Sequence, residues 1–218
     1  MNRRKQCWIV ILVLLAGCGH ETVSEIPYFS LEDMTPEWES SQTVSESEYR
    51  HVQSFIFTDQ SGESVSEEDV AGQPYVASFF FVSCTNICPT LKTRLTSVAA
   101  SFDADELKIL SHSVTPDLDT VERLAAYSRI NNIDERQWKL LTDSKEDVLR
   151  HAADSFGAQL KNYTAGVSGE EDFLHTETVF LVDGEGFVRG LYNGTLQLEI
   201  EQLIKDIDVL LLESKAAS

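Results

Sequence analysis

Apolar and polar residues along the chain follow two periods, one typical of strands and one typical of helices. The run 75–82 is almost wholly apolar, which predicts a central strand buried on both faces of a sheet. Two apolar runs, 178–182 and 187–192, flank an Asp-Gly-Glu-Gly turn sequence and therefore predict a β-hairpin. Further strands are expected at 51–58, 107–114 and 138–141.

Apolar residues three and four positions apart predict four helices, at 90–102, 119–130, 144–156 and 196–212. Asp119 or Thr120 is placed to cap the second helix, and Gly157 ends the third. Strands that alternate with helices before a final hairpin predict an α/β fold with a central mixed β-sheet flanked by helices. This order is that of a thioredoxin-like fold. In such sheets, ligands bind beyond the carboxyl ends of the strands.

The first residues have the pattern of an export signal. Basic residues at 3–5 precede the apolar run 8–15, and Ala-Gly-Cys follows at 16–18. The apolar run is shorter than the roughly 20 residues that a transmembrane helix needs, so it predicts a signal peptide. Residues 15–18 resemble a bacterial lipobox, in which the cysteine, here Cys18, is lipidated.

We therefore expect three parts: a lipoprotein signal peptide at 1–17, a membrane tether or extended segment at 18–50, and a thioredoxin-like domain at 51–218. The lipid anchor would hold the domain at the cell membrane, on the extracytoplasmic (periplasmic) side. Aromatic residues such as Tyr28 and Trp38 are scarce in disordered linkers. This part of the tether therefore has a second interpretation, as an extended segment docked on the domain.

The charge of the chain excludes one class of partner. Its 218 residues include 36 acidic and 17 basic side chains, a formal net charge of −19. Nucleic-acid binding relies on clusters of lysine and arginine, and no such cluster is visible in the sequence. We expect no nucleic-acid partner, and the acidic surface serves mainly to keep the protein soluble.

The cysteine count isolates one pair of thiols. Of four cysteines, Cys7 is removed with the expected signal peptide and Cys18 carries the lipid, which leaves Cys84 and Cys88. Two cysteines in an exported domain of this size do not form a disulfide scaffold, and a bridge across so short a loop stabilises little. The value of the pair is therefore expected to be chemical.

This pair lies between the apolar run 75–82 and Pro89. Proline fits the first turn of a helix, so Cys88 is expected at the helix start and Cys84 in the loop before it. Unpaired amides and partial positive charge at a helix N-terminus stabilise a thiolate, the reactive and metal-binding form. The two sulfurs can close into a disulfide, or they can bind one metal ion.

His175 precedes the strand expected at 178–182, in a loop that faces the cysteine helix in a thioredoxin-like fold. With Cys84 and Cys88 it would complete a Cys₂His ligand set. Soft thiolates favour Cu(I) and imidazole also suits Cu(II), whereas closed zinc sites usually have four ligands. Copper binding and thiol redox chemistry are the two functions that these residue types indicate.

The other four histidines are not expected to bind the metal, because nothing places them near the cysteines. His20 falls in the tether, and His51 starts a strand. His112 alternates with apolar residues along a strand, which predicts a position in the core or on a sheet face. His151 lies in a helix, where we expect it to be solvated.

Two acidic residues lie at the same edge of the predicted sheet as the cysteines. Asp117 and Asp119 follow the strand expected at 107–114. Their expected role is in the turn and in capping the helix that follows.

Three segments, in this order along the chain, resemble the Sco/SenC family of copper chaperones for cytochrome c oxidase assembly in bacteria and mitochondria. The segments are 79–89, 113–120 and 174–183. The resemblance covers about residues 50–212. It departs at Leu174, where the family often has an acidic residue, and at Thr85, where many members have proline. A third departure is Thr115, because many members have aspartate before this proline.

The resemblance implies that Cys84, Cys88 and His175 bind a copper ion, as Cu(I) or Cu(II). The protein would pass this ion to the subunit that carries the dinuclear copper centre of the oxidase. Oxidation of the cysteine pair to a disulfide would release the metal. The resemblance thus favours a metallochaperone over an enzyme.

A thiol-disulfide oxidoreductase is the alternative. Cys84, the more exposed thiol in this interpretation, would attack a disulfide of a copper-receiving partner, and Cys88 would resolve the intermediate. His175 distinguishes the two functions, because metal binding needs it and dithiol exchange does not. A peroxidase is a third candidate function, but apart from the cysteine pair the sequence has no feature of a peroxide pocket.

Overall fold

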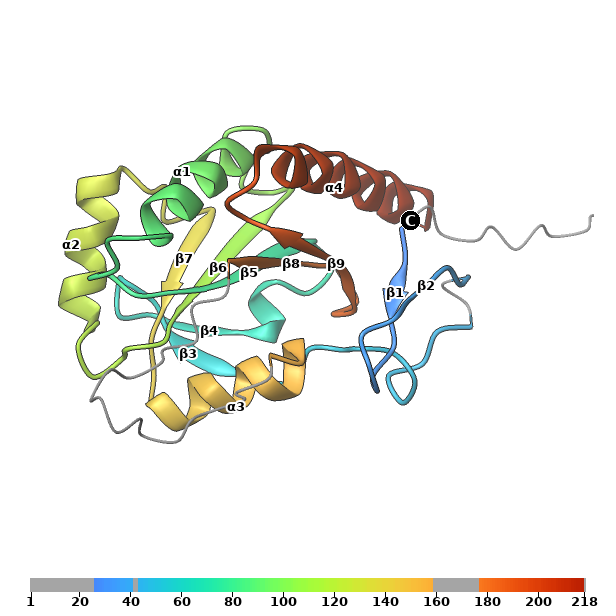
Figure 1. Cartoon of the computed structure of the whole chain (residues 1–218), viewed down its shortest axis with the longest axis horizontal. Helices are drawn as coiled ribbons and strands as arrows, with labels where there is room; N and C mark the ends of the chain where they lie inside the picture. Colours follow the sequence, from blue (N-terminus) through green and yellow to red (C-terminus); the bar gives the residue numbers. More distant parts are fainter. Residues whose placement is uncertain (1–25, 41–42, 159–176, 218) are drawn as a thin grey trace, which may run out of the picture.

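A five-stranded sheet in the order β7–β6–β5–β8–β9 forms the centre of the structure (Figure 1). The computed structural model describes residues 26–40, 43–158 and 177–217. The strands of the sheet are β5 (Tyr75–Phe80), β6 (Lys108–Ser113), β7 (Trp138–Leu141), β8 (Thr178–Val182) and β9 (Val188–Asn193). β5, β6 and β7 run parallel, β8 pairs antiparallel with β5, and β9 pairs antiparallel with β8. The mixed sheet with a terminal hairpin is thus confirmed.

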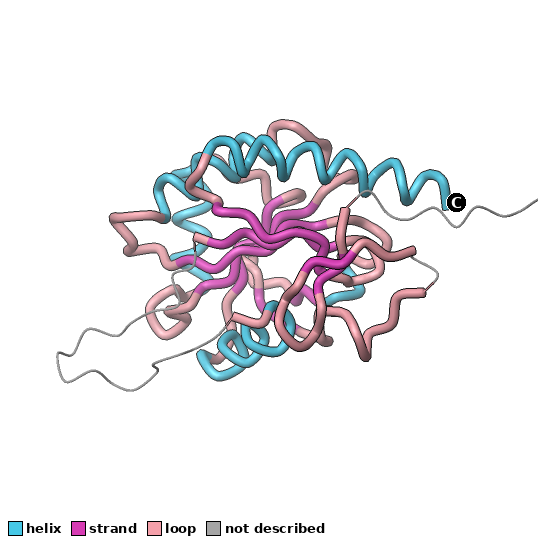
Figure 2. Tube along the Cα trace, turned by 45° about the vertical axis from the view of Figure 1, so that its right-hand side comes forward, coloured by secondary structure: helices cyan, strands magenta, loops and turns pink. Residues whose placement is uncertain are grey.

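Helices cover both faces of this sheet (Figure 2). They are α1 (Cys88–Ala99), α2 (Val121–Asn131), α3 (Lys145–Phe156) and α4 (Gln197–Ala217). Apolar residues of α1, α2 and α4 form one half of the core, while α3 packs into the other half with the hairpin of β3 (Ile56–Thr58) and β4 (Ser64–Ser66). The structure therefore has three layers, with the sheet in the middle.

β5 supplies both halves of the core, because successive side chains of a strand point to opposite faces. Val76 and Phe80 pack on the α1 side, whereas Ala77 and Phe79 pack on the α3 side. Every residue of β5 is buried. This burial on both faces is what the continuous apolar run predicts.

Local signals set the ends of the helices as expected. Thr120 caps α2, where its side chain accepts a hydrogen bond from the Arg123 amide. Ser144 caps α3 in the same way, and Gly157, at a φ of +61°, ends that helix in the left-handed region that favours glycine.

The sequence pattern does not predict the short extended segments correctly. The expected strand 51–58 contracts to β3, because residues before it bond to scattered partners in place of a ladder. The Val52 amide donates to the Gly186 carbonyl, and the Phe55 amide donates to the Glu67 carboxylate in the short 3₁₀ helix η1 (Glu67–Asp69). β4 is absent from the expectations.

The N-terminal segment docks on the domain as an extended strand pair. β1 (Tyr28–Phe29) pairs with β2 (Pro36–Glu37), and Ile26 and Tyr28 are buried. Tyr28 packs against Tyr49 and Phe187. The docked interpretation of this aromatic stretch is therefore correct for residues 26–40.

The buried guanidinium of Arg189 on β9 attaches this segment. Only 2 % of the Arg189 side chain is exposed, and it donates hydrogen bonds to the backbone carbonyls of Ile26 (3.0 Å) and Pro27 (3.1 Å). It also donates to the Asp183 carboxylate at 2.9 Å and lies over the Tyr28 ring, 3.9 Å from its centroid. One side chain thus joins the N-terminal segment to the sheet through charge, hydrogen bonds and cation–π contact.

The expected signal peptide and Cys18 lie outside the described residues. No helix within the described ranges is long and apolar enough to cross a membrane.

We predict that Arg189→Met lowers the free energy of unfolding by about 3–5 kcal/mol, because it leaves the Asp183 carboxylate buried without its cation. Chemical denaturation of the full chain measures this change. The matched control is Arg136→Met, which breaks the ion pair between Arg136 and Asp134. The Arg136 side chain is 83 % exposed and that of Asp134 is 47 % exposed. That pair should contribute less than about 1 kcal/mol. Equal effects of the two substitutions would contradict the anchoring role of Arg189.

Candidate metal centre

The cysteine pair lies at the carboxyl edge of the sheet, in the connection between β5 and α1. β5 ends at Phe80 and α1 begins at Cys88, followed by Pro89 in the first turn. Cys84 lies in the intervening loop. The structure therefore places both cysteines where the proline and the apolar run predict them.

The two thiols face each other across the start of α1. The backbone amide of Cys88 points at the Cys84 sulfur, with 3.4 Å between N and Sγ, and the Cys84 amide donates to the Phe81 carbonyl at 3.2 Å. Cys88 is 5 % exposed and Cys84 is half-buried, and neither is in a disulfide. Cys88 lines a small, mainly apolar cavity together with Phe80, Leu91 and Tyr127, among other residues.

The surroundings separate the acidities of the two thiols. Burial opposes ionisation of Cys84, but hydrogen bonds from the Cys88 thiol and from the amides of Cys88, Asn86 and Ile87 outweigh it and lower the pKa of Cys84. Burial raises the pKa of Cys88 to about 12, and the bond to Cys84 adds to this rise. Cys84 is therefore the thiol that ionises first and the one that solvent reaches.

A buried carboxylate fixes the loop that carries Cys84. Asp119 has no exposed surface, and its Oδ2 accepts hydrogen bonds from the Val82 amide (3.0 Å), the Ser113 hydroxyl (2.7 Å) and the Thr115 hydroxyl (2.9 Å). The Arg123 guanidinium lies 3.4 Å from its other oxygen. Asp119 thus connects the ends of β5 and β6 to the start of α2.

This role corrects the capping expected of Asp119, while Asp117 lies in the turn as expected. Thr120, not Asp119, caps α2, and Asp117 is exposed. The signal for a buried Asp119 was the cluster of short hydroxyl side chains at Ser113 and Thr115, directly after an apolar strand. These hydroxyls give a buried carboxylate its donors.

The third expected ligand, His175, lies outside the described residues, as does Leu174 beside it. In the described ranges, no group of three His, Cys, Asp or Glu side chains is arranged to hold a metal ion. The described part of the site is therefore a pair of thiols.

The other described histidines lie away from the thiols. The His51 imidazole contacts the Glu185 carbonyl at 2.8 Å, and His112 is fully buried in the sheet, as its strand position predicts. The expectation of a solvated His151 is wrong. This side chain is 6 % exposed, because α3 turns that face onto Phe55 and Phe57.

Comparison with models of known protein families identifies the family of this chain. The family model described as SCO1/SenC matches residues 43–212. The chain belongs to the SCO1/SenC family. The expected Sco/SenC membership is thereby confirmed, and the match includes the cysteine pair, Asp119 and His175.

Sequence relatives and solved structures agree with this membership. The SCO1 protein homolog of Bacillus subtilis is 29 % identical over 159 residues, which cover 72 % of this chain and 80 % of the relative. A SCO1/SenC family lipoprotein from Bacillus anthracis superposes with a TM-score of 0.65 at 28 % identity, covering 73 % of this chain and 94 % of that one.

Two further SCO1/SenC structures have the same fold. BsSco, reported with a disulfide switch and as a member of the Sco family of cytochrome c oxidase assembly proteins, superposes with a TM-score of 0.64 at 26 % identity. The match covers 75 % of this chain and 94 % of BsSco. ScoI of Bradyrhizobium japonicum, solved with copper bound, has a TM-score of 0.58 over 72 % of this chain and 98 % of ScoI. At 21 % identity this last likeness concerns the fold.

We predict that Asp119→Ala destabilises this SCO1/SenC protein by about 3 kcal/mol, because it leaves buried donors without an acceptor. The same change should speed hydrogen exchange at the Val82 amide. Asp117→Ala is the matched control in the same loop and should change stability by less than about 0.5 kcal/mol. Denaturation and exchange unchanged in Asp119→Ala would show that the carboxylate does not hold the loop.

Thiol reactivity should differ between the two cysteines. Alkylation requires the thiolate, so with a lowered pKa Cys84 reacts with iodoacetamide at a lower pH than Cys88, whose pKa is raised to about 12. Peptide mapping of the reduced full chain after timed alkylation at a series of pH values measures both rates. In urea the two thiols should react alike. Equal rates in the folded protein would refute the asymmetry.

Proposed function

We propose that this SCO1/SenC protein binds a copper ion through Cys84, Cys88 and His175. It would deliver the ion to the dinuclear copper centre of cytochrome c oxidase during assembly. The observation that carries the proposal is the pair of facing thiols at the start of α1, on the edge where ligands bind in such sheets. Membership in a family that includes an oxidase assembly protein, BsSco, supports it.

The described residues suit a soft, exchangeable ion. The Cys84 sulfur lies on the first amide of α1, which stabilises negative charge, and Cys88 is the first residue of that helix. Thiolates favour soft metal ions such as Cu(I). The His175 imidazole would complete the ligand set and also accept Cu(II).

Oxidation of the pair would release the ion. In exchange with a partner disulfide, a bond forms between the Cys84 and Cys88 sulfurs while the partner's sulfur–sulfur bond breaks. Two electrons pass to the partner, which leaves as two thiols after taking up two protons. Copper then loses both thiolate ligands.

A second function is favoured by the asymmetry of the thiols, namely reduction of a disulfide in a copper-receiving partner. Cys84, half-buried and with the lowered pKa, would attack and form a mixed disulfide. The buried Cys88 would then attack Cys84 and release the partner as a dithiol. His175 has no part in this reaction.

We also propose that Cys18 carries a lipid that anchors the protein, with the domain on the extracytoplasmic side of the membrane. The lipobox-like sequence at 15–18 supports this, as does the lipoprotein from Bacillus anthracis in the same family. Docking of residues 26–40 on the sheet would keep the domain close to the membrane surface.

The test is Cu(I) binding to the reduced full chain in competition with a Cu(I) chelator. We expect Cys84→Ser and Cys88→Ser each to remove one tightly bound equivalent, because each removes a thiolate ligand. His175→Ala should weaken that equivalent by about 10-fold or more. His51→Ala is the matched control and should leave it unchanged.

Two outcomes would overturn the copper site. A copper stoichiometry and affinity that both serine substitutions leave unchanged would exclude the thiols as ligands. Copper binding that is weak and unaffected by His175→Ala would exclude the Cys₂His set and favour disulfide reduction by Cys84 and Cys88.

A further inference from the structure

The face of the sheet opposite the thiols contains two buried imidazoles that the proposed function does not use. His112 lies on β6 and His151 on α3, and their ring centroids are 5.1 Å apart. Phenylalanine rings surround the pair: Phe55, Phe57, Phe79 and Phe156. Histidines in a purely structural core normally satisfy both ring nitrogens, so this pair requires an explanation.

One nitrogen of His112 is held and the other is free of partners. Its Nδ1 lies 3.4 Å from the Ser78 carbonyl, which can only accept, so Nδ1 carries the hydrogen. Nε2 therefore has a lone pair, and no described residue bonds to it. A backbone carbonyl on Nδ1 with a free Nε2 is the arrangement that orients histidine toward a metal.

His151 also has one bonded and one unbonded ring nitrogen, with a hydroxyl in place of the carbonyl. Its Nδ1 lies 3.1 Å from the Ser155 hydroxyl, whose oxygen also accepts a bond from the Gln53 amide, and no described residue bonds to its Nε2. A hydroxyl oxygen can accept two hydrogen bonds, so Nδ1 of His151 can be the donor. Burial lowers the pKa of His112 to about 4 and that of His151 to about 2, so both rings are neutral and ligand-ready at physiological pH.

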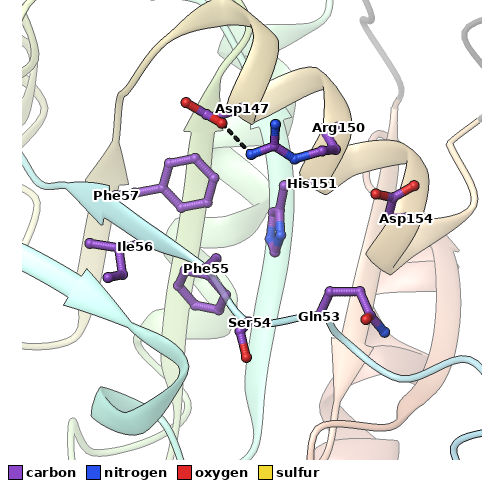
Figure 3. Close-up of a pocket in the computed structure, with 9 residues that line it drawn as sticks. All are labelled: Gln53, Ser54, Phe55, Ile56, Phe57, Asp147, Arg150, His151 and Asp154. Carbon is purple, nitrogen blue, oxygen red and sulfur yellow. Dashed lines mark hydrogen bonds and ion pairs between the residues drawn. The ribbon is translucent and has the colours of Figure 1, made fainter.

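A cavity of about 130 Å³ leads to His151 (Figure 3). Figure 3 shows the imidazole projecting from α3 toward the side chains of Phe55 and Phe57. Asp147 and Asp154 line the same cavity, and Asp147 forms an ion pair with Arg150. Two carboxylates against the one guanidinium of Arg150 leave this concave site net negative, which raises the local concentration of cations beside His151.

We propose that the Nε2 atoms of His112 and His151 bind one Cu(I) ion, at a second site separate from the cysteine pair. Imidazole–metal bonds are about 2 Å long and Nε2 lies about 1 Å from the ring centroid, so two rings that share one ion have centroids at most about 6 Å apart, a limit that the observed separation meets. The described residues place no carboxylate or thiol in contact with the two nitrogens. Burying a singly charged ion there therefore costs less free energy than burying a dication. Zinc is disfavoured because its closed sites usually have four ligands.

The test uses the full chain with the first site removed by Cys84→Ser, Cys88→Ser and His175→Ala together. Under anaerobic conditions and against a Cu(I) chelator, we expect this triple variant to bind one equivalent of Cu(I). Adding His112→Phe or His151→Phe, which keep ring volume, should weaken that equivalent by about 10-fold or more. His51→Phe in the same background is the matched control and should change nothing. Zn(II), titrated in parallel, should bind less tightly.

X-ray absorption of the copper-loaded triple variant keeps the test independent of how the phenylalanine variants fold. We expect nitrogen ligands with the multiple-scattering pattern of imidazole and no sulfur. No Cu(I) held against the chelator, binding unchanged by both phenylalanine variants, or preference for Zn(II) would overturn the site. Because the triple variant lacks the cysteine site, these results do not depend on whether that site binds copper.

Discussion

The geometry of the thiol pair depends on one buried carboxylate. Asp119 accepts a hydrogen bond from the Val82 amide, just after β5. The neighbouring Phe81 carbonyl accepts a hydrogen bond from the Cys84 amide. The Cys88 amide then points at the Cys84 sulfur. Three consecutive polar contacts therefore run from the carboxylate to the second cysteine. The hydroxyls of Ser113 and Thr115 bind the same oxygen and tie this chain of contacts to β6.

β5 connects the cysteine pair to the pair of buried histidines. Its alternating side chains reach the thiol half of the core through Phe80 and the imidazole half through Phe79, which stacks on His112. The pairing of β5 with β6 fixes the position of Phe79 relative to His112, because the two residues are partners in the strand register. Arg189 performs a similar task at the far edge, where it joins the N-terminal segment to β9.

Elements that depend on local pattern could be predicted from the sequence. β7 coincides with the strand expected at 138–141, and the limits of α3 follow from Ser144 and Gly157. The strand–loop–helix position of both cysteines follows from one apolar run and one proline. β1, β2 and β4 have only two or three residues each, too few for a period to be visible.

Contacts between distant segments could not be predicted. The burial of His151 depends on Phe55 and Phe57, almost a hundred residues earlier in the chain. His151 shares the buried face of α3 with Val148 and Ala152, but the aromatic rings that cover it have no local sign in the sequence. The network of Asp119 likewise depends on the end of β5, 37 positions away. Local pattern thus located the site, while the interactions that hold it in place are tertiary.

The asymmetry of the thiols bears on how an ion would leave the proposed site. A partner that takes copper replaces the existing ligands one at a time, and its first access is to the ligand nearest solvent. Of the two thiols, Cys84 is that ligand, because it is half-buried while Cys88 is 5 % exposed and packed beside Phe80 and Leu91. Cys88 would hold the ion while Cys84 is displaced. The same asymmetry sets the order of attack in disulfide exchange, with Cys84 first and Cys88 second. One geometry would therefore serve both copper delivery and disulfide reduction. The His175 imidazole is the group that distinguishes the two reactions.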